Sequence, residues 1–242
     1  MITIAIARSD LVDAATFEAL RASVPTWRRD ISDAYYRKED RYASVVSYAL
    51  LQHLWSRRST EPMPDIEWGR HGKPFFHDTA AWHFNWSHDA SVCVCAFATV
   101  PVGVDVQSRV RYDDGLFDRM AAPAENGLRD VLKRRDDLSS LWTRKEAVIK
   151  RTGRGLSTPL GEVDTLAEPS LVTFSCDEPD FRLSVCTEGS DVAGAAPQPT
   201  FRWVRPAPAS ATWLEAPAGR LSRVSTRPRV HTREVGRNGH LA

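Results

Sequence analysis

The stretch Pro-Val-Gly-Val-Asp-Val-Gln at residues 101–107 constrains the fold more than any other part of the sequence. Its three valines alternate with other residues, which predicts a β-strand with two different faces. The valine face requires a hydrophobic core. The opposite face carries only Gly103, Asp105 and Gln107. Such a face is either solvated or arranged around a ligand such as a metal ion and a phosphate chain, and the other motifs must distinguish these two cases.

Strand and helix patterns occur twice along the chain, which predicts an α/β (α+β) fold of two similar α/β lobes. We expect an N-terminal lobe at residues 1–103 and a C-terminal lobe at residues 104–206. In the first lobe the expected elements are a strand at the N-terminus, helices at 11–24 and 32–55, a strand and turn at 67–74, and strands at 83–86 and 91–100. In the second they are a helical region at 112–135, a helix at 140–151, and strands at 163–166, 171–175, 181–186 and 200–204.

Composition excludes several classes of protein. The 242-residue chain has a hydrophobic fraction of 42% and a charged fraction of 26%, as in ordinary soluble proteins, and its net charge of +1 argues neither for nor against a nucleic-acid partner. The longest apolar run, residues 91–106, is interrupted by polar residues, and the first residues lack a basic leader, so we expect no membrane association. Four cysteines without zinc-finger spacing indicate buried, reduced thiols and a cytoplasmic location.

Residues 207–242 differ in composition from the rest of the chain. Proline, alanine, serine and arginine dominate this segment, and its arginines outnumber its two glutamates. The composition predicts a disordered basic tail. Such a tail would suit nucleic acid, but an unselected extension is the favoured interpretation, and we expect no nucleic-acid partner.

A helix at 140–151 carries the most informative charged residues. Trp142, Glu146 and Lys150 are spaced i, i+4, i+8 and therefore share one face. Taken alone, this spacing indicates only a surface ion pair. Gly153 and Gly155 follow directly, however, and glycines allow a backbone to approach a ligand closely.

Two further motifs are weak when taken alone. Phe84-Asn85-Trp86-Ser87-His88-Asp89 is compatible with a polar turn or a structural histidine. A Ser-His hydrolase is disfavoured, because adjacent strand residues point to opposite faces and no Gly-x-Ser-x-Gly elbow is present. Gly72-Lys73-Pro74 is typical of a generic turn and does not match a P-loop.

Together and in this order, the motifs resemble the 4′-phosphopantetheinyl transferases of the large Sfp type. The family pattern is matched at Gly72-Lys73-Pro74, at Phe84 to His88, at Gly103 to Gln107 and at Trp142 to Leu156. The segment Tyr36 to Asp40 and the pair Ala124-Glu125 also fit, so the resemblance spans residues 1–205. It implies a pseudo-dimeric fold, a monomeric protein, and a metal site in the C-terminal lobe at the lobe junction.

The resemblance also implies an activity. The family transfers the phosphopantetheine arm of coenzyme A, the co-substrate, to a serine of an apo acyl, polyketide or peptidyl carrier protein, and releases 3′,5′-adenosine bisphosphate. The chain would then be a holo-acyl-carrier-protein synthase with Mg²⁺, or alternatively Mn²⁺, as cofactor. The sequence names neither the carrier protein nor the pathway, whether polyketide or nonribosomal peptide biosynthesis.

The same match implies a role for each candidate site residue. Asp105 and Glu146 would bind the metal, with Gln107 as a third ligand. Glu146 would also act as the base, and Lys150 would hold the pyrophosphate. The residues expected to contact coenzyme A are Ser87 and His88 at its phosphates, Gly72, Lys73 and Pro74 at its adenine, and Ser44 and Arg28 near its 3′-phosphate.

Two positions depart from the family pattern. Gln107 stands where many members have a third acidic ligand, and Ala43 stands where an arginine is common, with Arg41 as a substitute from a neighbouring turn. These departures motivate one alternative, a catalytically degenerate relative that binds coenzyme A or a carrier protein. A metal-dependent phosphoesterase that uses the same carboxylates with water as nucleophile is the second alternative.

Overall fold

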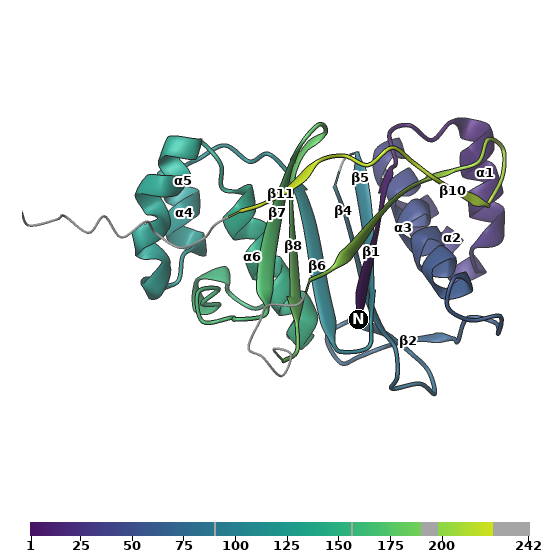
Figure 1. Ribbon diagram of the computed structural model, residues 1–242, viewed down its shortest axis with the longest axis horizontal. Helices are drawn as coiled ribbons and strands as arrows, with labels where there is room; N and C mark the ends of the chain where they lie inside the picture. Colours follow the sequence, from purple (N-terminus) through teal and green to yellow (C-terminus); the bar gives the residue numbers. More distant parts are fainter. Residues whose placement is uncertain (90, 156, 190–197, 225–242) are drawn as a thin grey trace, which may run out of the picture.

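The computed structural model describes residues 1–89, 91–155, 157–189 and 198–224. Two sheets lie side by side in the middle of the molecule, and helices cover the outer side of each (Figure 1). The expected mixed α+β fold with helices and several sheets is confirmed. Among the described residues, no helix combines the length and the apolar character needed to cross a membrane.

The first sheet has the strand order β10-β9-β1-β5-β4. Its central strand β1 pairs antiparallel with β5 and parallel with β9, while β4 forms one edge. Three helices, α1 to α3, lie on its outer side (Figure 1). The bounds are β1 Ile2–Arg8, α1 Ala14–Ser23, α2 Thr26–Ala34, α3 Lys38–Ser56, β4 His83–Asp89, β5 Val92–Ala98, β9 Thr200–Pro206 and β10 Trp213–Glu215.

The second sheet has the order β11-β7-β8-β6, and β6 forms the edge that faces the first sheet. Helix α6 packs on β6 and β8, and the shorter helices lie beyond it (Figure 1). The bounds are β6 Val102–Ser108, α4 Asp114–Met120, η1 Pro123–Leu128, α5 Arg129–Arg135, α6 Ser139–Thr152, η2 Leu160–Glu162, β7 Leu171–Asp177, β8 Asp180–Thr187 and β11 Leu221–Arg223. A separate hairpin consists of β2 Ile66–Trp68 and β3 Pro74–Phe76.

The valine face of β6 packs where the sequence pattern predicts. Val102, Val104 and Val106 are at most 2% exposed and belong to one core cluster with the isoleucines of β1 and the apolar residues of β8. The inner faces of the two sheets therefore share a hydrophobic core, and the polar face of β6 is directed toward α6. All four cysteines are buried free thiols, as expected.

Three secondary-structure predictions were wrong. The expected helix at 32–55 is interrupted at residues 35–37, so that α2 and α3 are separate helices. Residues 163–166 form no strand, because the carbonyl of Val163 and the backbone of Thr165 bond to buried side chains instead of to a neighbouring strand. Residues 207–224 are not a disordered tail, since β10 pairs with β9 and β11 pairs with β7. The remaining part of the predicted tail, residues 225–242, lies outside the described residues.

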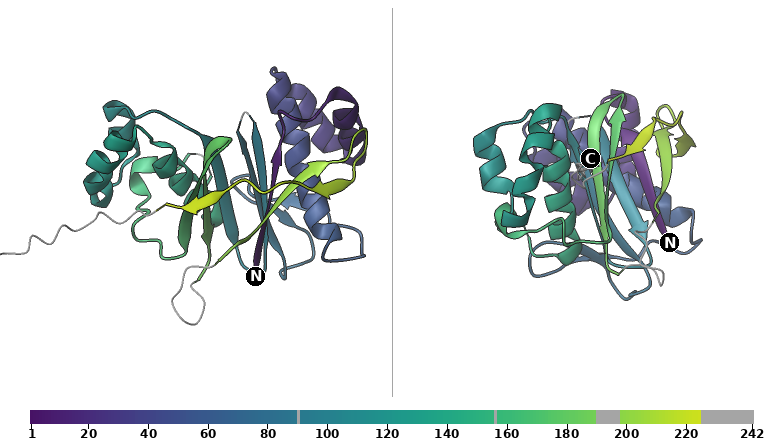
Figure 2. Two further views of the ribbon diagram at one scale, coloured as in Figure 1. Left: turned by 45° about the horizontal axis from the view of Figure 1, so that its top comes forward. Right: turned by 60° about the vertical axis from the view of Figure 1, so that its left-hand side comes forward.

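The chain also crosses between the sheets more often than the predicted lobe boundaries allow. After β8 it returns to the first sheet as β9 and β10, and it then crosses back to the second sheet as β11 (Figure 2). Residues 104–206 are therefore not one lobe, because β9 belongs to the N-terminal sheet. Trp213 and Leu221 explain why the chain is ordered here, since each packs against one of the two main core clusters.

Candidate active site

Edge strands β4 and β6 meet through side chains rather than through a backbone ladder. Three alternate residues of β4 accept hydrogen bonds from three alternate backbone N–H groups of β6. Two of these hydrogen bonds have donor–acceptor distances of 2.9 and 3.4 Å. An edge strand normally leaves such N–H groups without a partner in its sheet. The acceptor–donor pairs are Asn85 with Val104, Ser87 with Val106, and Asp89 with Ser108. This side-chain ladder fixes the register of the two sheets at their junction.

Gly103 allows the backbone of α6 to lie directly on β6. A Cβ atom added at Gly103 would be 2.1 Å from the carbonyl oxygen of Ala147 and 2.3 Å from the backbone nitrogen of Arg151. No side chain fits at that separation. The glycine in the polar face of the strand is therefore a contact point for α6, and it brings the charged residues of the helix over Asp105.

Asp105, Ser87 and Lys150 form a compact polar cluster at this junction. Asp105 Oδ1 accepts from Ser87 Oγ at 2.7 Å and from Lys150 Nζ at 2.6 Å, and Lys150 Nζ is 3.0 Å from Ser87 Oγ. Asp105 is only 5% exposed, and its second oxygen, Oδ2, has no hydrogen-bond partner among the described residues. An unpartnered buried carboxylate oxygen is costly, so the cluster is suited to receive a further cation.

Glu146 adds a second carboxylate to this cluster. It is half-buried and lies one helical turn before Lys150 on α6. Burial raises the pKa of Glu146, and the negative charge of Asp105 raises it further. Burial also raises the pKa of Asp105, although Lys150 and Ser87 oppose this. Both carboxylates therefore lie where added positive charge would stabilise their ionised forms.

The donor set fits Mg²⁺ better than it fits a metal that needs a protein-only cage. No cluster of three or more His, Cys, Asp or Glu side chains capable of holding a metal occurs in the described part of the chain. Mg²⁺ requires only one or two carboxylates, because it retains waters and binds substrate phosphates. The unpartnered Oδ2 of Asp105 and the neighbouring Glu146 would supply these two ligands.

Gln107 lies on the same face of β6 as Asp105, as the alternation predicts. Its Nε2 is 3.3 Å from Oδ2 of Asp89 on β4, so the amide donates to a carboxylate across the junction. The side chain is partly exposed. The structure thus places an acidic group beside position 107, although on the other strand.

Lys73 links the Gly-Lys-Pro turn to the junction. Its Nζ donates to the carbonyl oxygens of Val102 at 3.2 Å and of Arg151 at 2.8 Å. Burial lowers the pKa of Lys73 to about 8, and the charge of Arg151 contributes. The ammonium group therefore supports β6 and the end of α6, and the position of the turn at the adenine stays a prediction.

The two glycine-containing loops lie next to each other around Lys73. Gly153 has φ +68°, and a Cβ atom there would lie 3.4 Å from Lys73 Cδ. Gly72 has φ +81° and precedes Pro74, the first residue of β3, by two positions. An open cavity of about 510 Å³ lies between the loops and is lined in part by His71 and Gly153. Leu156, the last residue of the helix motif, lies outside the described residues.

Arg28 and His88 form a second basic group on the side of β4 that faces α2 and α3. Arg28 is 6% exposed, donates twice to the carbonyl oxygen of Ser44 at 3.0 and 2.6 Å, and lies 5.1 Å from the ring of Trp86. Burial lowers its pKa to about 10, so Arg28 remains a cation at neutral pH. Burial, with the charges of Arg28 and Lys150, lowers the pKa of His88 to about 4, so its imidazole is neutral.

Ser44 contacts this group through its backbone carbonyl, which accepts from Arg28, and not through its hydroxyl. Ser44 is fully buried, and its hydroxyl has no hydrogen-bond partner among the described residues, so a direct bond to a phosphate has no geometric support. Ala43 is also in the core, whereas Arg41 is exposed and donates to the carbonyl oxygen of Tyr35.

Sequence reasoning missed two sets of residues that hold the site together. Asn85 and Asp89 belong to the side-chain ladder, and their alternation with Ser87 was a visible signal. Lys145 and Glu125 form a fully buried ion pair that anchors α6. Glu125 was noticed only as part of the family pattern.

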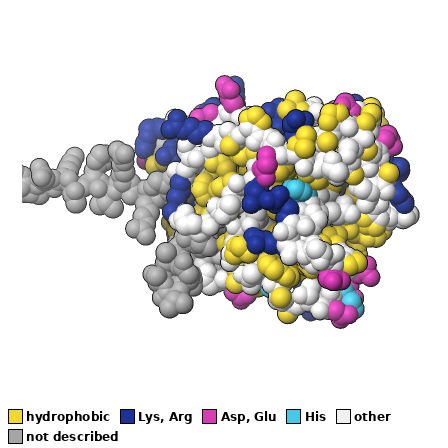
Figure 3. Space-filling model, turned by 45° about the vertical axis from the view of Figure 1, so that its right-hand side comes forward, with side chains coloured by type: hydrophobic (Ala, Val, Ile, Leu, Met, Phe, Trp, Pro, Cys, Tyr) yellow, Lys and Arg dark blue, Asp and Glu magenta, His cyan; other side chains and the backbone are white. Residues whose placement is uncertain are grey.

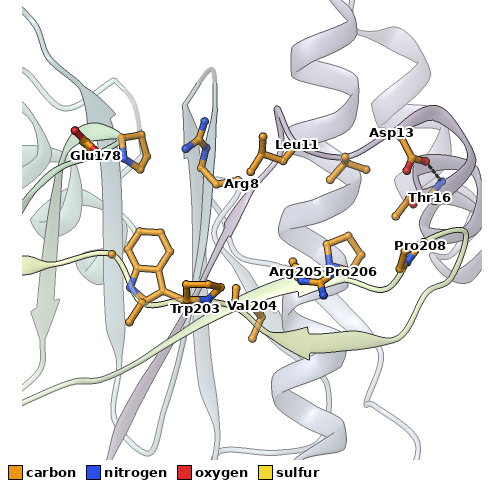
Figure 4. A pocket seen from close by; sticks show the side chains of 16 residues that line it. Arg8, Leu11, Asp13, Thr16, Glu178, Trp203, Val204, Arg205, Pro206 and Pro208 are labelled. Carbon is orange, nitrogen blue, oxygen red and sulfur yellow. Dashed lines mark hydrogen bonds between the residues drawn. The ribbon is translucent and has the colours of Figure 1, made fainter.

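One face and one cavity elsewhere on the described residues differ from this site. The face in Figure 3 mixes hydrophobic, basic and acidic side chains and is not uniformly charged. A cavity of about 400 Å³ between α1, β9 and the β7–β8 turn contains Arg8 and Trp203 (Figure 4). Arg8 is already paired with Asp10. None of the candidate site residues lines this cavity.

Fold and site together define a two-sheet α+β protein whose acidic and basic side chains converge where the sheets meet. A sequence model described as the 4′-phosphopantetheinyl transferase superfamily matches residues 101–194, which include β6 and α6. The 4′-phosphopantetheinyl transferase Sfp of Bacillus subtilis strain 168 is 27% identical over 184 residues, which are 68% of this chain and 82% of the relative. The 4′-phosphopantetheinyl transferase AcpT of Escherichia coli O157:H7 is 30% identical over 149 residues, 59% of this chain and 73% of the relative. The chain belongs to the 4′-phosphopantetheinyl transferase superfamily.

Proposed function

We propose that the chain transfers the 4′-phosphopantetheine arm of coenzyme A to a serine hydroxyl of an apo carrier protein, with release of 3′,5′-adenosine bisphosphate. The observation that supports this most strongly is the cluster of Asp105, Glu146 and Lys150 at the sheet junction, with one carboxylate oxygen of Asp105 unpartnered. Phosphoryl transfer depends mainly on positioning and on stabilisation of phosphate charge. This cluster offers groups for both.

Each residue has a role that follows from its contacts. Lys150 would hold the pyrophosphate as a point charge, because its ammonium group is partly exposed and already directed into the cluster by Asp105 and Ser87. Glu146 would accept the proton of the carrier serine, directly or through a water. Its raised pKa makes it a stronger base than an ordinary carboxylate.

The residues beyond the carboxylates would bind the rest of coenzyme A. His88 on β4, neutral at pH 7, and the buried cation Arg28 on α2 lie on the same side of β4 and would contact phosphate oxygens. The turn at Gly72, Lys73 and Pro74 would lie against the adenine, with Lys73 holding the turn in place.

Mg²⁺ is the proposed cofactor, with Mn²⁺ as the alternative, and when bound it would neutralise developing negative charge on the pyrophosphate. Asp105 and Glu146 would hold it together with Gln107, water and substrate phosphates. We further propose a cytoplasmic monomer whose partners are acyl, polyketide or peptidyl carrier proteins.

Transfer can be measured by intact mass of a panel of apo carrier proteins after incubation with the full chain, coenzyme A and Mg²⁺. We expect a mass gain equal to the phosphopantetheine arm on at least one carrier. Cleavage of coenzyme A without any carrier would instead indicate a phosphoesterase. Binding of coenzyme A without transfer, with either metal, would indicate a degenerate relative.

The carboxylates provide the matching variants. Asp105→Ala and Glu146→Ala should each lower the transfer rate at least about 100-fold, which corresponds to about 2.7 kcal/mol of transition-state stabilisation. Asp130→Ala, an exposed residue of α5, is the control and should retain the wild-type rate. Losses of about tenfold or less in both site variants would contradict the assigned metal site.

A further inference from the structure

The negative charge that is absent at position 107 is present on the neighbouring strand at Asp89. Asp89 lies two residues after Ser87 on β4, and Gln107 lies two residues after Asp105 on β6. Ser87 bonds to Asp105, and Asp89 bonds to Gln107, so the two pairs are successive rungs of one contact between the strands. Whatever binds at Asp105 therefore has the Asp89–Gln107 pair beside it.

The chemistry of this pair fixes the orientation of the Gln107 amide. A carboxylate only accepts hydrogen bonds, so the NH₂ end of the amide must face Asp89, as observed at 3.3 Å. The amide oxygen is then directed away from Asp89 and is left for another partner. Asp89 is itself held in place, because the same carboxylate oxygen accepts from the backbone N–H of Ser108.

The charge of Asp89 lies beside Asp105, because the Ser87–Asp105 and Asp89–Gln107 pairs are neighbours in the contact between β4 and β6. Asp89 thus contributes to the negative potential of the site without replacing Asp105 as a contact for Lys150.

We propose that Asp89 is a positioning residue of the metal site: it holds the Gln107 amide with its oxygen available to the cation, and it supplies from β4 the negative charge that a third carboxylate ligand would supply from β6. This inference rests on the proposed function, because it takes a divalent cation at Asp105 and Glu146 as the cofactor. Outer partners of this kind orient metal ligands and tune metal affinity in many sites.

The inference gives Asp89→Asn and Gln107→Glu opposite effects on cation binding. Adding an acid at 107 brings a further negative charge to the site, and a divalent cation relieves the repulsion between the two carboxylates, so metal affinity should not fall. Asp89→Asn keeps the size of the side chain but offers an NH₂ group, which would turn the Gln107 amide around and direct its oxygen toward β4. In the double variant Asp89→Asn with Gln107→Glu, the new amide donates to the new carboxylate, and the pair is restored with its polarity reversed.

The role of Asp89 can be tested by measuring Mn²⁺ binding to the full-length chain through electron paramagnetic resonance of free Mn²⁺. Coenzyme A is present in this measurement, and no carrier protein is added. We expect Asp89→Asn to weaken Mn²⁺ binding about tenfold and Gln107→Glu to bind Mn²⁺ at least as tightly as wild type. The double variant should return to within about threefold of wild type. An unchanged affinity in Asp89→Asn, or a double variant that binds Mn²⁺ as weakly as Asp89→Asn alone, would each overturn the inference.

Two controls separate this outcome from other failures. Asp130→Asn on α5 matches the chemistry of Asp89→Asn away from the junction and should leave Mn²⁺ binding unchanged. Thermal unfolding midpoints check the fold of each variant. If Asp89→Asn does not fold, the double variant carries the test, because it should bind Mn²⁺ more weakly than Gln107→Glu. If the double variant restores Mn²⁺ binding but the wild-type chain modifies no carrier, the proposed function alone is contradicted. If the wild-type chain modifies carriers but the double variant does not restore Mn²⁺ binding, this inference alone is contradicted.

Discussion

Helices α3 and α6 cover the two sheets in the same way but bury very different side chains. Most buried residues of α3 are apolar or small, and two of its buried serines, Ser44 and Ser47, have hydroxyls with no partner in the described part of the chain. Helix α6 buries Arg144 and Lys145, and both have specific partners. Hydrophobic packing therefore holds the first helix, while a network of charges and hydrogen bonds holds the second.

The network around α6 explains why this difference matters for the site. Lys145 donates to Glu125 and to the carbonyl oxygen of Val163, and Arg144 donates to the carbonyl oxygen of Thr165 at 2.7 Å. Glu125 also accepts from the backbone and hydroxyl of Thr165. Directional bonds of this kind fix the rotation of a helix about its axis more closely than apolar contacts do. Glu146 follows Lys145 directly, so the network determines where the carboxylate of Glu146 points.

The largest expected effect comes from removing the ammonium group of this network. Lys145→Met should lower the free energy of unfolding by about 3–5 kcal/mol, because it leaves the fully buried Glu125 without its cation. Chemical denaturation of the purified variant measures this loss.

Leu50→Met on α3 is the matched control for Lys145→Met, since Leu50 is also fully buried. A volume-conserving apolar exchange should cost less than about 1.5 kcal/mol. Adding Glu125→Leu to Lys145→Met should recover only part of the stability, because the unpaired charge is removed but the backbone N–H and hydroxyl of Thr165 lose their acceptor, and transfer should stay low if the network positions α6. Equal losses in Lys145→Met and Leu50→Met would show that the two helices are held in the same way.

A smaller effect is expected where α6 contacts β6 through backbone atoms. Gly103→Ala would place a methyl group at 2.1 Å from the carbonyl oxygen of Ala147, so the helix must shift outward. We expect a loss of about 1–3 kcal/mol in unfolding free energy and a reduced transfer rate, because Lys150 moves with the helix. Gly127→Ala, where a Cβ atom would meet open space, should change neither quantity. Retained stability and rate in Gly103→Ala would mean that α6 is not held at its observed distance.

The comparison also shows which features the sequence could predict. The alternation in β6 and the spacing of Glu146 and Lys150 are local patterns, and the structure confirms the strand and the helix that carry them. The α+β fold and the superfamily were predictable from ordered motifs.

The contacts across the junction were not predictable, because they depend on which edges meet. Asn85, Ser87 and Asp89 alternate visibly, but nothing local identifies β6 as the strand whose N–H groups they accept. Lys73 resembled a ligand-binding residue, although its ammonium group bonds to two backbone carbonyls. The strands at 213–215 and 221–223 were obscured by a composition rich in proline and arginine, and tertiary pairing with existing sheets outweighs that composition.

The smallest effect concerns acid stability at the junction. The pKa of His88 is lowered to about 4 in the folded chain by burial and by the charges of Arg28 and Lys150, whereas the unfolded chain binds this proton near pH 6.5. Between these values the unfolded state binds more protons, so the contribution of His88 to stability falls as the pH falls. Between pH 7 and pH 5.5, the unfolding free energy of wild type should therefore fall by about 1 kcal/mol more than that of His88→Gln.

Comparing wild type with His88→Gln is necessary because the carboxylates act in the opposite direction. The raised pKa values of Asp105 and Glu146 make the folded state bind more protons than the unfolded state, so their contribution to stability rises as the pH falls. These effects are present in both chains and cancel in the difference. His77→Gln, which alters a half-exposed side chain, should follow the wild-type pH dependence. An equal loss of unfolding free energy in acid for His77→Gln and His88→Gln would mean that protonation destabilises the junction no more than the surface of the first lobe. The contrast between buried charge and apolar packing would then not extend to β4.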